Sequence, residues 1–293
     1  MDLTWLEDFL ALAENRHFTR AAEARNVTQP AFSRRIQALE NWVGTPLVHR
    51  SPQGVALNAA GEFLRDQALT LTRDLHQMRR GALKAAGREG AALTIAATHA
   101  LSFTFFPGWI RAFAPLEAMG TLNLVSDTMA GCERVLLAGD ADFLLCHARP
   151  DTPTRLTPDA FTSLVVGRDQ LLPLVAPDAG GGPRWSLPGP AKLLAYSEAS
   201  GLGRILAARL ATAPDLALET VFTAPLAATL QTMACQGQGL AWLPRSLAAD
   251  DLAAGRLVEA GDLPIEVEIR LFRPRRRQSP TAEAFWQRLQ RAA

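Results

Sequence analysis

The chain contains few cysteines, and their spacing suggests neither a metal site nor a disulfide framework. Cys132, Cys146 and Cys235 are the cysteines of the 293-residue sequence, and no two of them form a CxxC pair. An odd number at wide spacing argues against a zinc ribbon, a thioredoxin-type centre and a disulfide-stapled secreted scaffold. We therefore expect three free and mostly buried thiols.

Long apolar runs are also missing. No stretch of about 18 uncharged apolar residues occurs, so the sequence predicts no transmembrane helix. The first residues include Asp2, Glu7 and Asp8, whereas a signal peptide begins with positive charge. These absences predict a cytoplasmic protein without a membrane partner.

Neither sign of charge is in excess. Thirty basic residues stand against 29 acidic ones, which leaves a formal net charge of +1, so any affinity for nucleic acid must be local. The lysines are Lys84 and Lys192, so nearly all positive charge is guanidinium, which binds phosphates and guanine edges through paired hydrogen bonds. With 48% hydrophobic and 20% charged residues, the composition is that of a globular protein of two or three domains.

The N-terminal region has the pattern of short helices. Apolar residues spaced by three and four predict helices at about 2–14 and 18–25. Thr28 then provides an N-cap, with Pro30 in the first turn of a third helix. Two helices joined by a short turn form the helix-turn-helix layout.

The third helix is expected to bury one stripe and expose polar groups elsewhere. Its apolar stripe is Phe32, Ile36 and Leu39, and the outward residues are Gln29, Pro30, Ser33, Arg34 and Gln37. Arg and Gln hydrogen-bond base edges, and a helix N-terminus binds phosphate; an ordinary solvated face is the alternative. A β-hairpin turning at residues 51–54 predicts a wing, from which Arg50 and Gln53 can contact the DNA backbone or minor groove.

The segment from Ala21 to Arg50 resembles the winged helix-turn-helix of LysR-type transcriptional regulators. The matching positions are Ala21, Ala22, Val27–Ile36, Leu39, Glu40, Gly44–Leu47 and Arg50. The resemblance implies that Gln29, Pro30, Ser33, Arg34 and Arg35 line a DNA-facing recognition helix. Residues 25–36 also resemble a subgroup that includes a hypochlorite-responsive regulator. The expected DNA-binding residues are Thr28, Gln29, Pro30, Ser33, Arg34, Arg35, Gln37, Arg50 and Gln53.

A long helix follows the hairpin, with Asn58 as its cap in place of the family's usual Thr. Its apolar residues alternate at steps of four and three, a heptad seam made by Leu64, Ala68, Leu71, Leu75 and Met78. One helix cannot bury such a seam alone. The helix either packs on its own domain or, as the resemblance implies, pairs with the same helix of a second subunit. Residues 87–90 are expected to form a hinge.

From residue 91 the pattern changes to strands alternating with helices, which is typical of parallel α/β units. Strands are predicted at 92–97, 122–125 and 143–146, with helices at about 101–114 and 129–138, and further strands at 171–176, 193–196 and 239–242. The resemblance implies a two-lobed effector domain similar to a periplasmic binding protein. The expected division is a winged helix-turn-helix at 1–58, a dimerising linker at 59–90 and an effector domain at 91–293, with lobes at 91–163 plus 266–293 and 164–265.

Ligands of open α/β sheets lie beyond the carboxyl ends of strands, where helix N-termini present free N–H groups. The polar residues expected there suit a small anion or polar ligand and are Thr98, His99, Ser102, Ser126, Thr128, His147, Ser197, Ser200, Gly201, Arg204 and Thr223. Each has a structural alternative: Thr98, Ser126 and Ser200 as helix caps, His99 and His147 as hydrogen-bonded core residues, and Arg204 as a surface cation. Asp127 follows the same rule but would repel a carboxylate.

Motifs of enzymes are missing. The sequence has no GxSxG elbow, HExxH, P-loop or GxGxxG after a strand, so we do not expect an enzyme. A redox sensor is another class, with Met119, Met129, Met233 and the three cysteines as candidate targets and Met78 explained by the seam. The basic run 273–277 is expected to be a solvated face.

Together these features predict a multidomain α/β protein that regulates transcription by binding specific duplex DNA. A small molecule or oxidant is expected to shift the two lobes and change packing in a dimer or tetramer, and hence DNA bending and access of RNA polymerase. The alternative is a small-molecule binding protein or redox sensor with weak or vestigial DNA binding. No cofactor or metal is expected.

Overall fold

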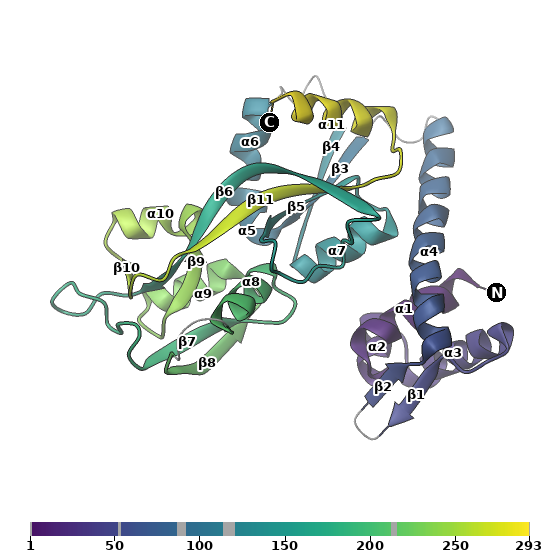
Figure 1. Cartoon of the computed structure of the whole chain (residues 1–293), viewed down its shortest axis with the longest axis horizontal. Helices are drawn as coiled ribbons and strands as arrows, with labels where there is room; N and C mark the ends of the chain where they lie inside the picture. The colour runs from purple at the N-terminus through teal and green to yellow at the C-terminus, as the bar shows by residue number, and fades with distance from the viewer. Residues whose placement is uncertain (1, 52–53, 87–91, 114–120, 212–215, 293) are drawn as a thin grey trace. The chain divides into compact units, whose positions relative to one another are not determined.

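The computed structural model describes residues 2–51, 54–86, 92–113, 121–211 and 216–292, and the chain divides into two compact units (Figure 1). The first unit covers Met1–Arg88, and the second includes Glu89–Leu136 and Ala141–Ala293. The expected hinge at 87–90 lies outside the described residues. Within them, no helix has the length and apolarity that a bilayer crossing requires.

The first unit is a helix-turn-helix followed by a hairpin and a long helix. Its elements in order are α1 (Leu3–Asn15), α2 (Phe18–Ala24), α3 (Gln29–Val43), β1 (Val48–Ser51), β2 (Gly54–Leu57) and α4 (Ala59–Ala85). Phe32, Ile36 and Leu39 are fully buried, which confirms the predicted stripe of α3. Together with Phe9 and Leu47 they form one core, and each such side chain contributes about 1.5–3 kcal/mol by leaving water.

The junction between the hairpin and α4 explains why Asn58 and Gly61 stand there. Asn58 Oδ1 accepts a hydrogen bond from the Gly61 N–H at 2.8 Å, and Asn58 Nδ2 donates to the Pro46 carbonyl at 2.7 Å. The predicted cap is confirmed. A Cβ at Gly61 would lie 2.1 Å from the Leu47 carbonyl oxygen, so only glycine lets the first turn of α4 approach the hairpin this closely.

The heptad seam of α4 divides into a packed part and an exposed part. Leu64 and Ala68 pack against the core of the first unit. Leu71 and Met78 are 43% and 64% exposed, and Phe63 nearby is 70% exposed. The start of the seam therefore packs on its own domain, as the first alternative predicts, and its later turns present apolar surface.

The second unit begins with the predicted parallel strands. β3 (Ala92–Thr98) pairs in parallel with β4 (Thr121–Asp127) and β5 (Phe143–Ala148), and α7 (Met129–Ala138) connects β4 to β5. The single helix expected at about 101–114 is wrong, because the structure has α5 (His99–Thr104) and α6 (Phe106–Phe113). Pro107 explains the break, since proline in a helix interior clashes with the carbonyl four residues earlier.

Two long antiparallel strands join the lobes. β6 (Phe161–Val175) pairs with β11 (Ile265–Pro274) along most of their length, and Figure 1 shows both running from the region of β3–β5 to that of β9 and β10. β9 (Ala241–Pro244) and β10 (Val258–Glu259) also pair with β6 in antiparallel fashion. The expectation of a second purely parallel unit is therefore wrong, because β6 enters the second lobe and β11 returns from it in the opposite direction.

The remaining elements complete the second lobe and close the first. β7 (Ala191–Tyr196) and β8 (Leu218–Ala224) form a separate parallel pair, and the helices are α8 (Gly201–Leu210), α9 (Ala227–Cys235), α10 (Arg245–Ala253) and α11 (Pro280–Ala292). Phe285 and Trp286 of α11 pack on the core that contains β3 and β5. A second core contains Leu194, Leu230 and Trp242.

The position of each residue along β6 and β11 shows where one lobe gives way to the other. Leu164 of β6 and Ile269 of β11 pack with the core that contains β3 and β5. Leu171 of β6 and Val267 of β11 pack with the second core, that of Leu194, Leu230 and Trp242. The two strands therefore pass from one core to the other between residues 166 and 171 of β6 and near Glu268 of β11. The expected lobe borders, at 163/164 and 265/266, fall in these strands a few residues earlier.

The basic run near the C-terminus is partly structural. Arg273 is buried, donates to both carboxylate oxygens of Glu283 at 3.0 and 2.6 Å, and lies over the ring of Trp286. These hydrogen bonds hold the pKa of the Glu283 carboxyl below its usual range. The expectation of a solvated face is wrong for Arg273, because the guanidinium ties the end of β11 to α11.

Candidate nucleic-acid interface and ligand cleft

The N-terminal half of α3 presents a polar surface. Thr28, Gln29, Pro30, Arg34 and Gln37 are exposed, and Ser33 is half-buried. Gln29 Nε2 donates to Ser33 Oγ at 3.1 Å, and Gln37 Nε2 donates to Asn41 Oδ1 at 3.3 Å. These exposed amides exchange partners easily, so the surface can hydrogen-bond a partner molecule at little cost.

The first turn of α3 keeps unsatisfied donors. Thr28 occupies the N-cap position, but its side chain makes no capping hydrogen bond, and Pro30 stands in the first turn. The N–H groups of this turn have no partner within the helix, and the helix dipole gives them positive character. A phosphate is a suitable ligand for them.

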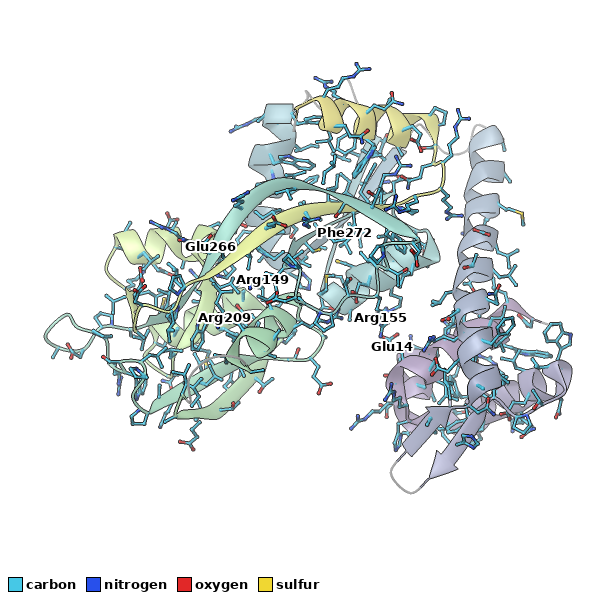
Figure 2. The ribbon with its side chains drawn as sticks, viewed as in Figure 1. Glu14, Arg149, Arg155, Arg209, Glu266 and Phe272 are labelled. Carbon is cyan, nitrogen blue, oxygen red and sulfur yellow. The ribbon has the colours of Figure 1, made fainter. Side chains whose placement is uncertain are left out.

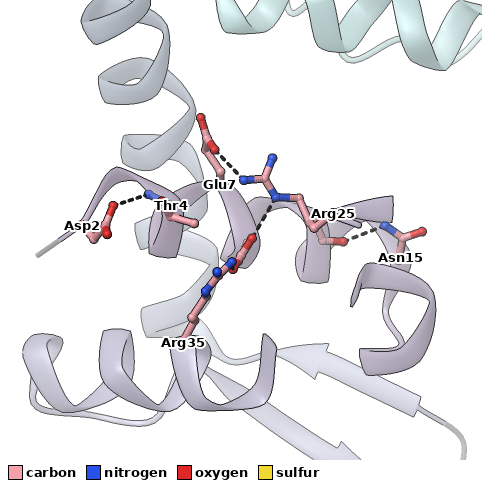
Figure 3. Close-up of polar contacts among 8 residues, drawn as sticks. Asp2, Thr4, Glu7, Asn15, Arg25 and Arg35 are labelled. Carbon is pink, nitrogen blue, oxygen red and sulfur yellow. Dashed lines mark hydrogen bonds and ion pairs between the residues drawn. The ribbon is translucent and has the colours of Figure 1, made fainter. Parts of the chain in front are cut away.

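Arg34 and Arg35 are adjacent in sequence but differ in role. Arg35 Nη1 donates to Asp8 Oδ2 at 3.1 Å, and Arg25 Nε donates to Asp8 Oδ1 at 2.8 Å. Figure 3 shows that these contacts, with the ion pair between Arg25 and Glu7, join α1, α2 and α3. The Asp8 side chain is fully buried, so Arg35 positions α3, whereas Arg34 is exposed and makes no hydrogen bond within the described chain.

The hairpin is less fully described. Arg50 lies in β1 opposite Val55 of β2, and Gln53 lies outside the described residues. The structure thus confirms the hairpin without describing either predicted side chain.

In the second unit, polar residues converge on a small cleft between the lobes. It holds about 30 Å³, and its walls include six of the predicted residues: Thr98, His99, Thr128, His147, Ser200 and Gly201. The helices α7, α8 and α9 all begin at this cleft. Three helix N-termini favour negative charge, and a volume of this size accommodates a ligand of few atoms or a water.

The hydroxyl groups of the cleft differ in how they are used. Ser200 Oγ caps α8 by accepting from the Gly203 N–H at 3.3 Å, and Thr128 Oγ1 accepts from the Gly131 N–H at 3.1 Å. Thr98 Oγ1 is buried and has no hydrogen-bond partner among the described residues. Of these three hydroxyls, Thr98 therefore gains most from a ligand.

Ser102 and Ser126 form hydrogen bonds with His99 and with each other. His99 Nδ1 is 3.0 Å from Ser126 Oγ, Ser126 Oγ is 2.9 Å from Ser102 Oγ, and Ser102 Oγ donates to the His99 carbonyl at 2.7 Å. Neither serine lines the cleft. Their hydrogen bonds instead fix the imidazole of His99, which does.

His147 connects β5 with the second lobe. Its Nε2 is 3.4 Å from Asp169 Oδ2, which also accepts from Ser246 Oγ at 2.5 Å. Burial opposes ionisation of Asp169, but the hydrogen bonds from His147 and Ser246 outweigh it and hold the pKa of the carboxyl below its usual range. No local pattern pointed to Asp169 or Ser246, because they lie 22 and 99 positions from His147 in the sequence.

Arg204 is paired across the lobes. Its two terminal nitrogens donate to the two oxygens of Glu133 at 2.9 Å each, and the Glu133 carboxylate is fully buried. Glu133 also accepts from Thr154 Oγ1 and the Arg155 N–H. Arg204 is therefore not a simple surface cation, and Glu133, which the sequence analysis did not single out, ties α7 to α8.

Two more predicted residues, Ser197 and Thr223, do not line the cleft. Thr223 was expected after a strand but lies within β8 and is exposed. Ser197 joins β7 to β8 through its N–H, which donates to the Ala224 carbonyl, and it does not line the cleft. The bounds of β8 could not be located from the pattern, so the expected position was wrong.

Other residues complete the walls. Asp127 and Met129 line the cleft with Ala100, Leu202, Pro225 and Ala227. A Cβ at Gly131 would lie 2.1 Å from Asp127 Oδ2, so Gly131 makes room for that carboxylate. The apolar members carry no chemical signal in a sequence, which is why Leu202, Pro225 and Ala227 were not predicted.

The cysteines are poor nucleophiles in this fold. Cys132 and Cys146 are buried and Cys235 is half-buried, and all three are free thiols, as expected. Burial raises the pKa of Cys132 to about 12 and that of Cys235 to about 11, and it raises the pKa of Cys146 further. Oxidation proceeds through the thiolate, so these environments disfavour a thiol-based sensor. Among the residues described, no cluster of His, Cys, Asp and Glu has the makeup of a metal site.

Comparisons with known proteins agree with this architecture. Residues 3–62 match the family described as "Bacterial regulatory helix-turn-helix protein, lysR family", and residues 86–293 match the "LysR substrate binding domain". The HTH-type transcriptional regulator YjiE of Escherichia coli (strain K12) is 32% identical over 99% of this chain and 94% of its own.

Two solved structures are similar over nearly the whole length. Full-length HypT of Salmonella typhimurium, a hypochlorite-specific LysR-type regulator, has a TM-score of 0.59 and 30% identity, covering 100% of this chain and 98% of its own. Vibrio fischeri DarR, solved in complex with DNA, has a TM-score of 0.55 and 31% identity, covering 98% and 97%. With both domains matched and the fold shared, the chain belongs to the LysR family of DNA-binding transcriptional regulators and carries that family's effector-binding domain.

Proposed function

We propose that this regulator reads operator DNA with the N-terminal half of α3. The observation that carries the proposal is the contrast on that helix: Arg34, Gln29 and Gln37 are exposed, while Arg35 is held by the buried Asp8. Arg34 and the two amides suit base edges, and the free N–H groups of the first turn suit a phosphate. Thr28, Pro30 and Ser33 lie beside them, and Arg50 and Gln53 belong to the wing.

The regulator acts as a dimer or tetramer in the cytoplasm. The later turns of α4 expose Leu71 and Met78 at seam positions, and a second copy of α4 provides a matching apolar stripe. Dimerisation places two recognition helices on two half-sites. This doubles the local positive contacts of a chain whose formal net charge is only +1.

The effector of the interlobe cleft is a small anion or small polar molecule. Three helices begin at the cleft, and Thr98, whose hydroxyl has no hydrogen-bond partner among the described residues, lines it. Asp127 opposes anion binding on its side of the cleft, because its carboxylate repels an anion. The proposed position of the anion is therefore nearer α8 and α9. The protein binds this effector without transforming it and is not an enzyme.

Movement of the lobes transmits the signal. Glu133–Arg204 and His147–Asp169 connect the elements that flank the cleft. An effector that binds one lobe arrangement better than the other shifts the population toward it. The resulting change in oligomer packing alters half-site spacing, DNA bending and the access of RNA polymerase.

An oxidant is the second candidate input, supported by the similarity to HypT and by the position of Met129. Met129 is buried in the cleft wall, whereas the thiols are disfavoured by their raised pKa values. Met233 is partly buried in the second core, and Met119 lies outside the described residues. Hypochlorous acid would transfer its oxygen to the thioether, giving a sulfoxide, chloride and a proton. The hypothesis that an oxidant is the input predicts that hypochlorite changes operator affinity in the wild type but not in Met129→Leu.

The first experiment is capture of genomic DNA fragments by the purified chain at near-physiological salt, followed by sequencing. Enrichment of an inverted repeat by the wild type, and its loss in Arg34→Ala, is the expected result. Retention without sequence preference, with and without hypochlorite or small anions, would contradict the proposal. It would favour a ligand-binding protein with vestigial DNA binding.

A further inference from the structure

A second and larger cavity lies next to the interlobe cleft. It holds about 440 Å³ and is enclosed by the end of β5, the loop at 149–160, the start of β6, the second half of β11 and the first turn of α8. Met129, His147 and Gly201 form the wall that it shares with the cleft. Its volume is within the range of about 300–1,000 Å³ that small-molecule sites occupy.

The walls combine apolar surface with guanidinium groups. Phe161, Phe272 and Leu156 provide the apolar part, and the charged lining residues are Arg149, Arg204, Arg270 and Arg275, with no Asp or Glu among the lining residues. Arg149 and Phe272 are labelled in Figure 2. A wall of this composition matches a molecule with an apolar body and a negative group.

The arginines are held in place before any ligand arrives. Arg149 donates to both oxygens of Asp151 and to the Glu266 carbonyl, and Arg204 binds Glu133 through two hydrogen bonds. Arg270 donates to Glu268 at 2.6 Å and to Ser163 Oγ at 2.8 Å. Each guanidinium has five N–H donors, so these bonds fix the groups and leave donors over.

Arg275 differs from the other three arginines in its electrostatic partners. Its Nε donates to the Pro158 carbonyl at 2.6 Å, and the described chain offers it no carboxylate. The hydroxyl of Thr152, also in the cavity wall, is buried and lacks a hydrogen-bond partner among the described residues. Arg275 is exposed at the rim of the cavity, where its guanidinium can pair with an incoming anion, and the buried Thr152 hydroxyl can donate to an anionic oxygen.

We propose that this cavity is a second ligand site, which binds an organic carboxylate with an aromatic or apolar body. The carboxylate pairs with Arg275 at the rim, and the body lies against Phe161 and Phe272. The inference does not depend on the identity of the cleft effector or of the operator. Because the two cavities share a wall, a ligand here also changes the setting of Met129 and His147 in the cleft.

The test is titration calorimetry of the full chain with 2-naphthoate, and with 2-naphthamide as the uncharged analogue. We expect saturable binding of the acid and at least tenfold weaker binding of the amide. Arg275→Gln should weaken binding of the acid at least fivefold. The matched control is Arg277→Gln, which removes the same charge from an exposed position outside the cavity and should change binding less than twofold.

Two further variants locate the ligand. Pro153→Trp places a bulky ring into the cavity from an exposed loop position and should abolish binding. Thr98→Val alters only the neighbouring cleft and should change binding less than twofold. No saturable binding to the wild type, equal binding of acid and amide, or equal effects of Arg275→Gln and Arg277→Gln would overturn the proposal. A loss with Thr98→Val as large as that with Arg275→Gln would place the molecule in the cleft and overturn it as well.

Discussion

The two units offer polar groups to a ligand in opposite ways. On the convex surface of α3, Gln29, Arg34 and Gln37 are exposed and stand within nine residues of one another. In the effector domain the polar groups lie in a concave cleft, and they come from segments as distant as Thr98 and Ser200. The first surface is made by one helix, and the second exists only because β6 and β11 bring two lobes together.

Buried ion pairs show the same difference. Asp8 holds three neighbouring helices of one small domain, whereas Glu133 holds helices that belong to different lobes. The first network is part of a rigid support for α3. The second crosses the boundary between the two lobes, so the two carboxylates should respond differently to substitution.

The largest expected effect is on the support of α3. Asp8→Ala leaves Arg25 and Arg35 without their buried partner and should destabilise the first unit by about 3–5 kcal/mol. Hydrogen exchange followed by mass spectrometry should show faster exchange in α1–α3 with little change in the second unit. Glu23→Ala, at an exposed position of α2, is the control and should be neutral. Equal protection in Asp8→Ala and the wild type would contradict a structural role.

The interlobe pair should have a smaller effect. Glu133→Gln keeps the shape but removes the charge that Arg204 pairs with, and it should cost about 2–3 kcal/mol. Denaturant unfolding followed by tryptophan fluorescence, to which Trp242 and Trp286 of the two lobe cores contribute, measures the loss. Glu259→Gln, on the exposed end of β10, serves as the comparison. If both variants unfold at the same denaturant concentration, the pair does not hold the lobes.

The neighbouring arginines of α3 provide the next test. Arg34→Ala should weaken operator binding by about 1–3 kcal/mol without loss of stability, because it removes the base contact proposed above. Arg35→Ala should lower stability through the loss of the bond to Asp8. Fluorescence anisotropy with an operator duplex and thermal unfolding of both variants separate the two effects. An unstable Arg34→Ala, or unchanged affinity in it, would contradict the division of roles.

The cleft hydroxyls should give an effect of about 1 kcal/mol or less. Ser200→Ala removes the cap of α8 and should destabilise the second unit by about 1 kcal/mol. Thr98→Val removes a buried hydroxyl that has no partner in the described part of the chain, so stability should stay equal or rise. Thermal unfolding in the absence of effector checks both. A loss in Thr98→Val as large as that in Ser200→Ala would show that the hydroxyl has a partner in the folded protein.

The smallest effect is expected from the thiols. At pH 7.5 the pKa values of about 12 for Cys132 and about 11 for Cys235 leave almost no thiolate. Iodoacetamide should therefore label the native chain slowly, Cys235 before Cys132 and Cys146, and labelling should accelerate as the pH rises toward 11. Urea-unfolded protein is the control and should react fully. Rapid labelling of native Cys132 would contradict this expectation and would favour a thiol-based redox sensor.

Local patterns determined the first unit almost completely. Helix spacing, the cap at Asn58 and the polar face around Arg34 are properties of consecutive residues, so the sequence alone predicted them. The motif resemblance then identified the DNA-binding family. What the pattern could not show is that Arg35 turns to Asp8, because that contact joins residues 27 positions apart.

Tertiary structure decided the second unit. The sequence predicted strands and the polar residues near their ends, but the antiparallel course of β6 and β11 depends on how the chain returns between lobes. Glu133, Asp169 and the cavity around Arg275 arise from long-range packing between elements whose spacing in sequence is arbitrary. Periodicity reports which face of an element is buried, and only the assembled fold reports what that face meets.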